Sequence, residues 1–219
     1  MSIDYYMMPG SAPCRAVFLT AAALGISDKL REHKLDLMTG EQLKPEYIKI
    51  NPQHTIPTIV DEGLSLWESR AILRYLVNRY GGADSPLYPA RPAARARVDQ
   101  RLDFDLGTLY GRFAAYFYPQ LFGGKAEEGS LKKLQDALGF LNTFLEGQKY
   151  VAGDNLTIAD LSIVATISTI EVTGISINEY PNIVRWYGLV KTTAPNYKKL
   201  NEEPLVEFKA FVDSKMSSK

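Results

Sequence analysis

"YYMMPGSAPCRAV", residues 5–17, joins a predicted strand to a predicted helix. The aromatic and methionine run ends at Pro9-Gly10. Pro13 permits a helix to begin there, because the N–H that proline lacks has no helical partner in a first turn. The junction carries a hydroxyl, Ser11, and a thiol, Cys14, near a helix N-terminus that favours negative charge. The stretch therefore predicts a strand-to-helix turn with reactive groups at the bend.

The first eighty residues alternate strand and helix signals. Hydrophobic periodicity, Gly25 and the Asp61-Glu62-Gly63 turn separate these elements. We predict strands over 3–8 and 32–37, helices over 13–25, 44–50 and 69–82, and a hairpin over 57–68. The predicted order is β-α-β-α-β-β-α.

The remainder of the chain has a helical period throughout. Helices are predicted over 93–117, where the period runs to Pro119, and over 130–147, 157–174, 181–195 and 202–215. The segment 157–174 is apolar nearly all round, which is typical of a core helix. A stretch rich in glycine, proline and serine separates the two halves. We therefore predict an α/β domain over 1–82, a linker over 83–91 and an all-α domain over 92–219.

Composition narrows the classes of partner. Of the 219 residues, 46% are hydrophobic, and the 25 Lys and Arg balance the 25 Asp and Glu, which argues against nucleic-acid binding. No run approaches the ~20 apolar residues of a membrane helix, and the first residues lack a leader pattern, so a cytoplasmic protein is expected. One cysteine excludes an intramolecular disulfide, and two scattered histidines argue against a metal site.

Three further motifs have both structural and functional interpretations. In "NPQHTIPT", residues 51–58, Pro57 precedes a strand, and a turn proline is the favoured reading from the residues alone. In "LWESRAI", residues 66–72, Ser69 is a candidate helix N-cap, flanked by charges that suit an amino-acid head group, although such caps are common. In "NLTIAD", residues 155–160, Thr157 and Asp160 predict a structural capping box.

The segments "PGSAPCRAV", "NPQHTIPT", "WESRAI" and "NLTIADLS", in this order, resemble the cytosolic glutathione transferases, and most closely the insect delta class. The resemblance covers essentially the whole chain. It implies a thioredoxin-like N-terminal domain followed by an all-helical domain. It also implies glutathione as co-substrate, small hydrophobic electrophiles as second substrates, a detoxifying role and a homodimer, without metal, nucleic acid or membrane as partners.

The resemblance assigns roles to individual residues. Ser11 matches the serine whose hydroxyl donates a hydrogen bond to the glutathione sulfur. Pro57 matches a cis-proline, with the Ile56 backbone pairing with the cysteinyl part of glutathione. Glu68 and Ser69 match residues that hold the γ-glutamyl end. The remaining implied glutathione-binding residues are Arg70, which lies beside that end, and His54 and Gln42 near the glycyl carboxylate.

Two positions depart from the family pattern, and one set of aromatics matches a second site. Many delta members have histidine where Gln42 stands, and relatives often have tyrosine where Asp103 stands. The second difference bears on dimer contacts or substrate preference.

Two helices carry more aromatic residues than a single core-facing stripe would hold. The additional aromatic side chains predict the walls of an apolar pocket. By resemblance this is the electrophile site, with Tyr110, Phe113, Phe117, Tyr118, Phe208 and Phe211 as its predicted residues.

The chemistry at the bend has two candidate residues. Cys14 has the spacing of the second cysteine in a C-x-x-C motif, but Ser11 stands where the attacking cysteine would be, so a buried apolar role is favoured for Cys14. The thiol to be activated is then that of glutathione. A hydrogen bond from Ser11 and the positive helix end would lower its pKa. Thiol-disulfide exchange through Cys14 and a non-catalytic carrier are the alternative hypotheses.

Overall fold

A four-stranded sheet forms the core of the N-terminal half in the computed structural model, which describes residues 2–217. The strand order is β2-β1-β3-β4, with β1 parallel to β2 and antiparallel to β3, and with β3 and β4 forming a hairpin. Ile3, Tyr5 and Met7 alternate inward along β1, the pattern expected of a strand with one buried face. The strands are β1 Ile3–Met7, β2 Leu30–Lys34, β3 Thr58–Asp61 and β4 Leu64–Trp67.

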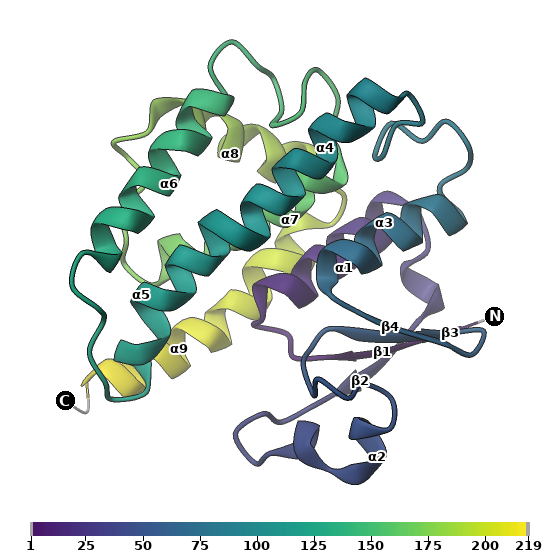
Figure 1. Ribbon diagram of the computed structural model, residues 1–219, viewed down its shortest axis with the longest axis horizontal. Coiled ribbons are helices and arrows are strands. Elements are labelled where there is room, and N and C mark those ends of the chain that lie inside the picture. Colours follow the sequence, from purple (N-terminus) through teal and green to yellow (C-terminus); the bar gives the residue numbers. More distant parts are fainter. Residues whose placement is uncertain (1, 218–219) are drawn as a thin grey trace.

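Three helices complete this half, and the predicted order β-α-β-α-β-β-α is confirmed. They are α1 Ala12–Ala23, α2 Pro45–Ile48 and α3 Ser69–Tyr80. Figure 1 shows α1 and α3 between the sheet and the helical half, with α2 on the far side of the strands. The fold is therefore the thioredoxin-like arrangement that the sequence analysis expected, followed by helices only.

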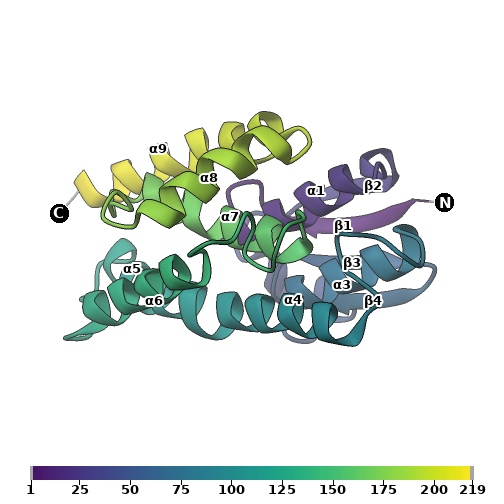
Figure 2. The same cartoon turned by 90° about the horizontal axis from the view of Figure 1, so that it is seen from above.

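The C-terminal half contains six α-helices within residues 92–217 and two π-helical segments, 105–110 and 198–202. Helix α7 lies between a layer made by α4, α5 and α6 and a layer made by α8 and α9 (Figure 2). The helices are α4 Pro92–Phe104, α5 Gly111–Leu121, α6 Ser130–Phe144, α7 Ile158–Val172, α8 Pro181–Thr193 and α9 Glu203–Ser217.

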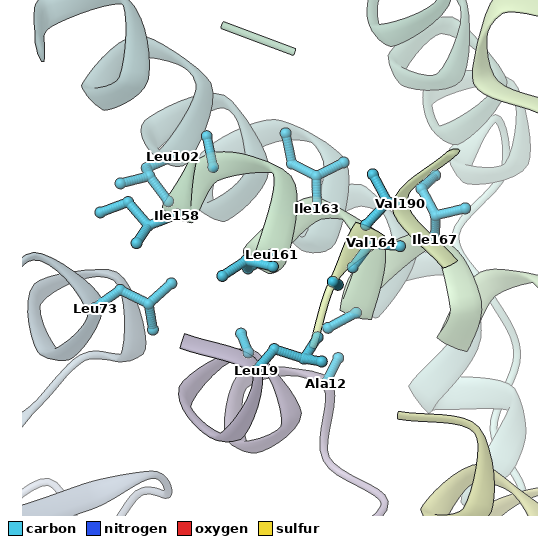
Figure 3. Close-up of a cluster of buried hydrophobic side chains, with 14 of the residues drawn as sticks. Ala12, Leu19, Leu73, Leu102, Ile158, Leu161, Ile163, Val164, Ile167 and Val190 are labelled. Atoms are coloured by element: carbon cyan, nitrogen blue, oxygen red, sulfur yellow. The ribbon is translucent and has the colours of Figure 1, made fainter. Parts of the chain in front are cut away.

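Helix α7 is the predicted core helix, and it is buried from Ile158 to Ile170. It packs against α1, α3, α4 and α8, and Figure 3 shows its apolar side chains in one cluster with Leu19 of α1, Leu73 of α3, Leu102 of α4 and Val190 of α8. The predicted capping box opens it: the Asp160 carboxylate accepts hydrogen bonds from the backbone N–H and the hydroxyl of Thr157, both at 2.9 Å. The two halves of the chain therefore share one hydrophobic core.

Two predicted boundaries are wrong. The second strand covers residues 30–34 rather than 32–37, because its parallel register with β1 runs from Ile3 beside Leu30 to Met7 beside Lys34 and ends with β1. The fifth α-helix continues through Pro119 to Leu121. A proline in the last turn removes only one backbone donor there, and its carbonyl accepts from the Gly124 N–H at 2.8 Å.

Candidate active site

Ser11 lies at the N-terminus of α1, directly after the loop that leaves β1. Its backbone is extended (φ −69°, ψ 123°), and its side chain makes no capping hydrogen bond to the helix. The hydroxyl is half-buried and lines a cavity rather than closing the helix end. A serine at this position can therefore donate its proton to a ligand beside the positive end of α1.

Cys14 lies one turn further along α1 and is fully buried. Burial raises the pKa of its thiol, and hydrogen bonds from the Ser11 hydroxyl and from Met8 offset this only in part. Because the thiolate is the reactive form, this environment suits an inert core residue. The structure agrees with the interpretation of Cys14 as a small buried residue.

The Ile56–Pro57 peptide bond is cis, as predicted. The loop before it is fixed by Asn51, whose fully buried amide donates to the Thr55 carbonyl and the Thr58 hydroxyl, each at 3.0 Å. The N–H and C=O of Ile56 make no backbone hydrogen bond within residues 2–217. Ile56 therefore offers a free stretch of backbone to an extended peptide, in the manner of an added strand.

The turn before α3 differs from the prediction. The helix begins at Ser69 itself, so Ser69 is not the N-cap; Glu68 holds that position with φ 65° and ψ 100° and makes no capping hydrogen bond. An αL-like φ is costly for a glutamate, and such backbone strain concentrates at ligand sites. The Glu68 side chain is exposed, whereas Ser69 is buried and its hydroxyl accepts from the Arg70 guanidinium at 2.9 Å.

The side chain of Arg70, which was predicted to lie beside the γ-glutamyl end, forms a buried ion pair. Its guanidinium is 5% exposed and donates to the Asp105 carboxylate at 2.6 Å. Asp105 also accepts from the hydroxyls of Ser162 at 2.6 Å and Thr166 at 2.9 Å, both on α7. This ion pair joins the start of α3 to the helical half, and Arg70 also contacts the Ser69 hydroxyl. The sequence offered no signal for this pairing across 35 residues.

The two residues expected near the glycyl end lie on either side of α2, Gln42 in the short 3-10 helix Glu41–Leu43 and His54 in the loop that follows α2. His54 is exposed and has φ 45°. Gln42 is half-buried; its amide nitrogen donates to the Leu37 carbonyl at 3.4 Å, and its amide oxygen is buried with no partner among residues 2–217. A buried amide oxygen without a partner is a place where a ligand donor fits.

One cavity of about 450 Å³ connects Ser11 to the predicted aromatic site. Tyr110, Tyr118, Phe208 and Phe211 line it together with Ser11 and Ile56. The two tyrosine hydroxyls lie 3.2 Å apart, which gives an otherwise apolar wall one polar spot. The arrangement places an apolar chamber of ligand size next to a hydroxyl donor and an unpaired backbone segment.

Phe113 and Phe117 do not line this cavity, which corrects two predicted residues. Phe113 is fully buried, Phe117 is 4% exposed, and their rings stack 5.2 Å apart within the core. They lie on the α5 face that packs against the rest of the helical half, where a fully buried aromatic stripe belongs. Residues that the sequence analysis did not assign to the pocket also line it: Met8, Pro9, Gly10, Pro13, Leu37, Met38, Leu121, Phe122, Pro204 and Glu207.

A second buried arginine lies beneath the site. Arg15, on α1, is fully buried and donates from Nη1 to the Ser168 hydroxyl at 2.9 Å and from Nη2 to the Ala165 carbonyl at 3.1 Å. It also donates to the side chains of Asn201 and Thr169. Burial lowers the pKa of Arg15 to about 10, so the guanidinium stays charged at neutral pH.

Comparison with known proteins agrees with this fold. Residues 6–84 match the glutathione S-transferase N-terminal domain and residues 99–190 the C-terminal domain. A delta-class glutathione transferase from Nilaparvata lugens is 50% identical, with a TM-score of 0.92 over 97% of this chain and 99% of that one. A glutathione transferase from Bombyx mori is 44% identical, with a TM-score of 0.91 over 96% and 98% of the two chains.

The thioredoxin-like half and the all-helical half together are the two-domain architecture of the glutathione transferases. The chain belongs to the glutathione transferase family, with delta-class enzymes of insects among its relatives, and it is an enzyme of that family. Glutathione is the family's co-substrate.

Among residues 2–217, no group of three or more histidine, cysteine, aspartate or glutamate side chains is placed to hold a metal ion. No helix in the same range has both the length and the apolar run needed to cross a membrane.

Proposed function

We propose that this enzyme activates the thiol of glutathione through Ser11 and conjugates it to small hydrophobic electrophiles. The observation that carries the proposal is the shared cavity: Ser11, whose side chain makes no capping hydrogen bond, lines it together with apolar and aromatic residues. A free thiol with a pKa of ~8.5 is a few per cent thiolate at neutral pH. Lowering this pKa by about two units, roughly 2.7 kcal/mol, makes the thiolate the major form.

Glutathione would be held at both ends, away from the sulfur. The exposed Glu68 carboxylate suits the ammonium of the γ-glutamyl group, and the N–H groups at the start of α3, beside Ser69, suit its carboxylate. The Ile56 backbone, presented by Pro57, pairs with the cysteinyl residue. His54 and Gln42 serve the glycyl end, where the Gln42 amide oxygen is unpaired. Arg70, held by Asp105, lies beside the γ-glutamyl end in this proposal.

The second substrate would occupy the aromatic part of the cavity. Tyr110, Tyr118, Phe208 and Phe211 offer a surface for an apolar electrophile beside the reacting sulfur. Burying such a ligand removes water from the thiolate, which strengthens its interaction with the Ser11 hydroxyl. Phe113 and Phe117 support this wall from behind.

The test is a pH titration of thiolate absorbance for glutathione bound to the wild type, Ser11→Ala and Cys14→Ala, with turnover measured in parallel. A hydrogen bond to a charged group contributes ~1.5–3 kcal/mol, so Ser11→Ala should raise the pKa of the bound thiol by roughly one to two units. Turnover near neutral pH should fall about ten- to a hundredfold. Cys14→Ala should retain nearly full activity. A Ser11→Ala variant with an unchanged thiol pKa and rate would refute the proposal.

Pairing into a homodimer and a cytoplasmic location stay predictions. Sedimentation of the purified protein tests the first, and fractionation of cells that express it tests the second.

A further inference from the structure

Helix α9 lines the cavity of Ser11 with one of its faces. The lining residues of this helix recur at the three- and four-residue spacing of a helix face: Pro204, Glu207, Phe208 and Phe211. This face lies close to the turn before Ser11, because a Cβ atom placed at Gly10 would come 2.9 Å from the Phe208 Cβ. A group on this face of α9 is therefore near the turn assigned to the glutathione sulfur.

Glu207 adds a negative charge to this lining. Among the cavity-lining residues within 2–217 it is the only charged side chain, and the polar groups beside it are the hydroxyls of Ser11 and two tyrosines. Glu207 forms no hydrogen bond or ion pair with another residue of that range, and Lys209, two residues further along α9, pairs with Asp213 at 2.7 Å instead. The exposed Glu207 carboxylate is therefore without a countercharge at the cavity.

The aromatic side chains of the cavity are a second feature that attracts cations, because the face of an aromatic ring carries partial negative charge. Two of these rings already have a protein cation over them: the Arg70 guanidinium is 5.6 Å from the centroid of Tyr110, and the Lys215 ammonium is 5.8 Å from that of Phe211. Phe122 is 63% exposed, so its ring is open to a ligand. The lining rings without a lysine or arginine over them in the described chain are Tyr118, Phe122 and Phe208.

We propose that Glu207 is a specificity-determining residue, and that it makes this enzyme favour electrophiles with an organic cation, such as a quaternary ammonium group, on an arm remote from the reacting carbon. This inference rests on the proposed function of Ser11 and names a substrate class for the same cavity. The aromatic rings pack against the apolar part of the substrate and the methyl groups of the cation, and the Glu207 carboxylate supplies the countercharge. Because Glu207 is exposed, water screens the pair and the preference is moderate.

Two matched substrates test the proposal. Both are para-chloro-dinitrobenzamides, one with a trimethylammonioethyl arm on the amide nitrogen and the other with its neutral isostere, a 3,3-dimethylbutyl arm. In both, the thiolate sulfur forms a bond to the ring carbon that carries chlorine, and chloride leaves with the electron pair of the C–Cl bond, so the arm takes no part in the chemistry. Each kcat/KM is divided by the rate constant of the uncatalysed reaction with glutathione, and the quotient for the cationic amide over that for the neutral amide is the charge preference.

We expect the charge preference of the wild type to exceed one and Glu207→Gln to lower it about 3- to 10-fold, the size of one solvent-screened charge pair. The neutral amide reports any change in cavity shape, which cancels in the quotient. Glu207→Lys should lower the preference further and favour the neutral amide. Added salt should reduce the preference of the wild type and leave that of Glu207→Gln unchanged.

The matched control is Glu203→Gln, which removes the same charge from an exposed glutamate of α9 that does not line the cavity. It should keep the charge preference of the wild type. If neither amide is turned over, their analogues without chlorine, used as inhibitors of chlorodinitrobenzene conjugation, give the same comparison from inhibition constants.

A charge preference of one or below in the wild type, or one that Glu207→Gln leaves unchanged, overturns this inference, while continued conjugation of neutral aryl chlorides spares the proposed function. An equal fall in Glu203→Gln also overturns it, because the net charge of α9 rather than the position of Glu207 would then be the cause. Absence of conjugation with any aryl chloride, together with a bound-thiol pKa equal to that of free glutathione, instead overturns the proposed function itself.

Discussion

Two arginines of the N-terminal half, Arg70 on α3 and Arg15 on α1, enter the same interface and meet opposite surroundings. Arg70 meets the Asp105 carboxylate, and Arg15 meets only hydroxyls, an amide and a carbonyl. Both guanidiniums are buried, and α7 supplies hydroxyls to both clusters. The contrast lies in charge alone: the first cluster is neutral as a whole, and the second retains one positive charge.

The difference separates two uses of a buried cation. A paired guanidinium fixes geometry, and here it holds the start of α3 to the helical half. A guanidinium whose partners are all neutral keeps a net positive charge in its cluster, as Arg15 does on α1. The π-helical segments contribute to both clusters, Asp105 to the first and Asn201 to the second.

The largest loss of stability is expected for Asp105→Asn, which makes the first cluster resemble the second. It leaves Arg70 without its countercharge in a site that has no substitute, and breaking a buried ion pair costs about 3–5 kcal/mol. Denaturant unfolding of the variant and the wild type measures the difference. A loss below about 1 kcal/mol would show that Arg70, like Arg15, is satisfied by neutral partners, and the contrast between the clusters would disappear.

A smaller loss is expected for Ser162→Ala, which removes one hydroxyl donor from Asp105 and leaves the ion pair in place. A hydrogen bond to a charged group contributes about 1.5–3 kcal/mol, against about 1 kcal/mol for a neutral pair. The free energy of unfolding should therefore fall by about 1.5–3 kcal/mol. A value near 0.5 kcal/mol would indicate that the Ser162 hydroxyl contributes no more than a neutral hydrogen bond to this cluster.

The sequence predicts the architecture well because its signals are local. The order of strands and helices follows from periodicity and from glycine and proline positions, and the capping box at Thr157 is a motif within four residues. The cis bond at Pro57 required the family resemblance, since the residues alone favoured a turn proline. The position between strand and helix marked Ser11 and Cys14 as candidates, and the family resemblance assigned the predicted role to Ser11.

The buried clusters could not be predicted in the same way. The partners of Arg15 lie 150 to 186 residues away along the chain, and nothing in the local pattern around it marks them. Arg70 was assigned to the ligand because it follows Glu68 and Ser69, and only the fold shows that it turns toward Asp105. Phe113 was assigned to the pocket by helical spacing, which identifies a shared face but not whether that face meets a cavity or the core.

A gain or no change in stability is expected for Asn201→Asp at neutral pH, the converse of Asp105→Asn. The Arg15 guanidinium lowers the pKa of the introduced carboxyl in the folded state. The stabilisation of the folded state by this carboxylate is then fully present above the ordinary Asp pKa of ~3.9. It is lost as the pH falls through the lower pKa of the folded state. The unfolding free energy of the variant relative to wild type should rise between about pH 3 and pH 6. A fall over that range would mean that burying the carboxylate outweighs the pairing with Arg15.

The smallest stability effect is expected for Glu68→Ala. This variant tests whether the exposed Glu68 carboxylate binds glutathione, or whether the turn before α3 has its conformation only because the Arg70–Asp105 ion pair holds it. The Glu68 side chain is exposed and forms no ion pair among residues 2–217, so unfolding should change by less than about 0.5 kcal/mol. Loss of a charge-assisted contact to the γ-glutamyl ammonium should weaken glutathione binding by about 10- to 100-fold, with a smaller change in kcat at saturating glutathione. Calorimetric titration with glutathione, alongside kcat and KM, measures both quantities. An unchanged affinity would remove Glu68 from the binding site and leave the Arg70 cluster as the reason for the conformation of this turn.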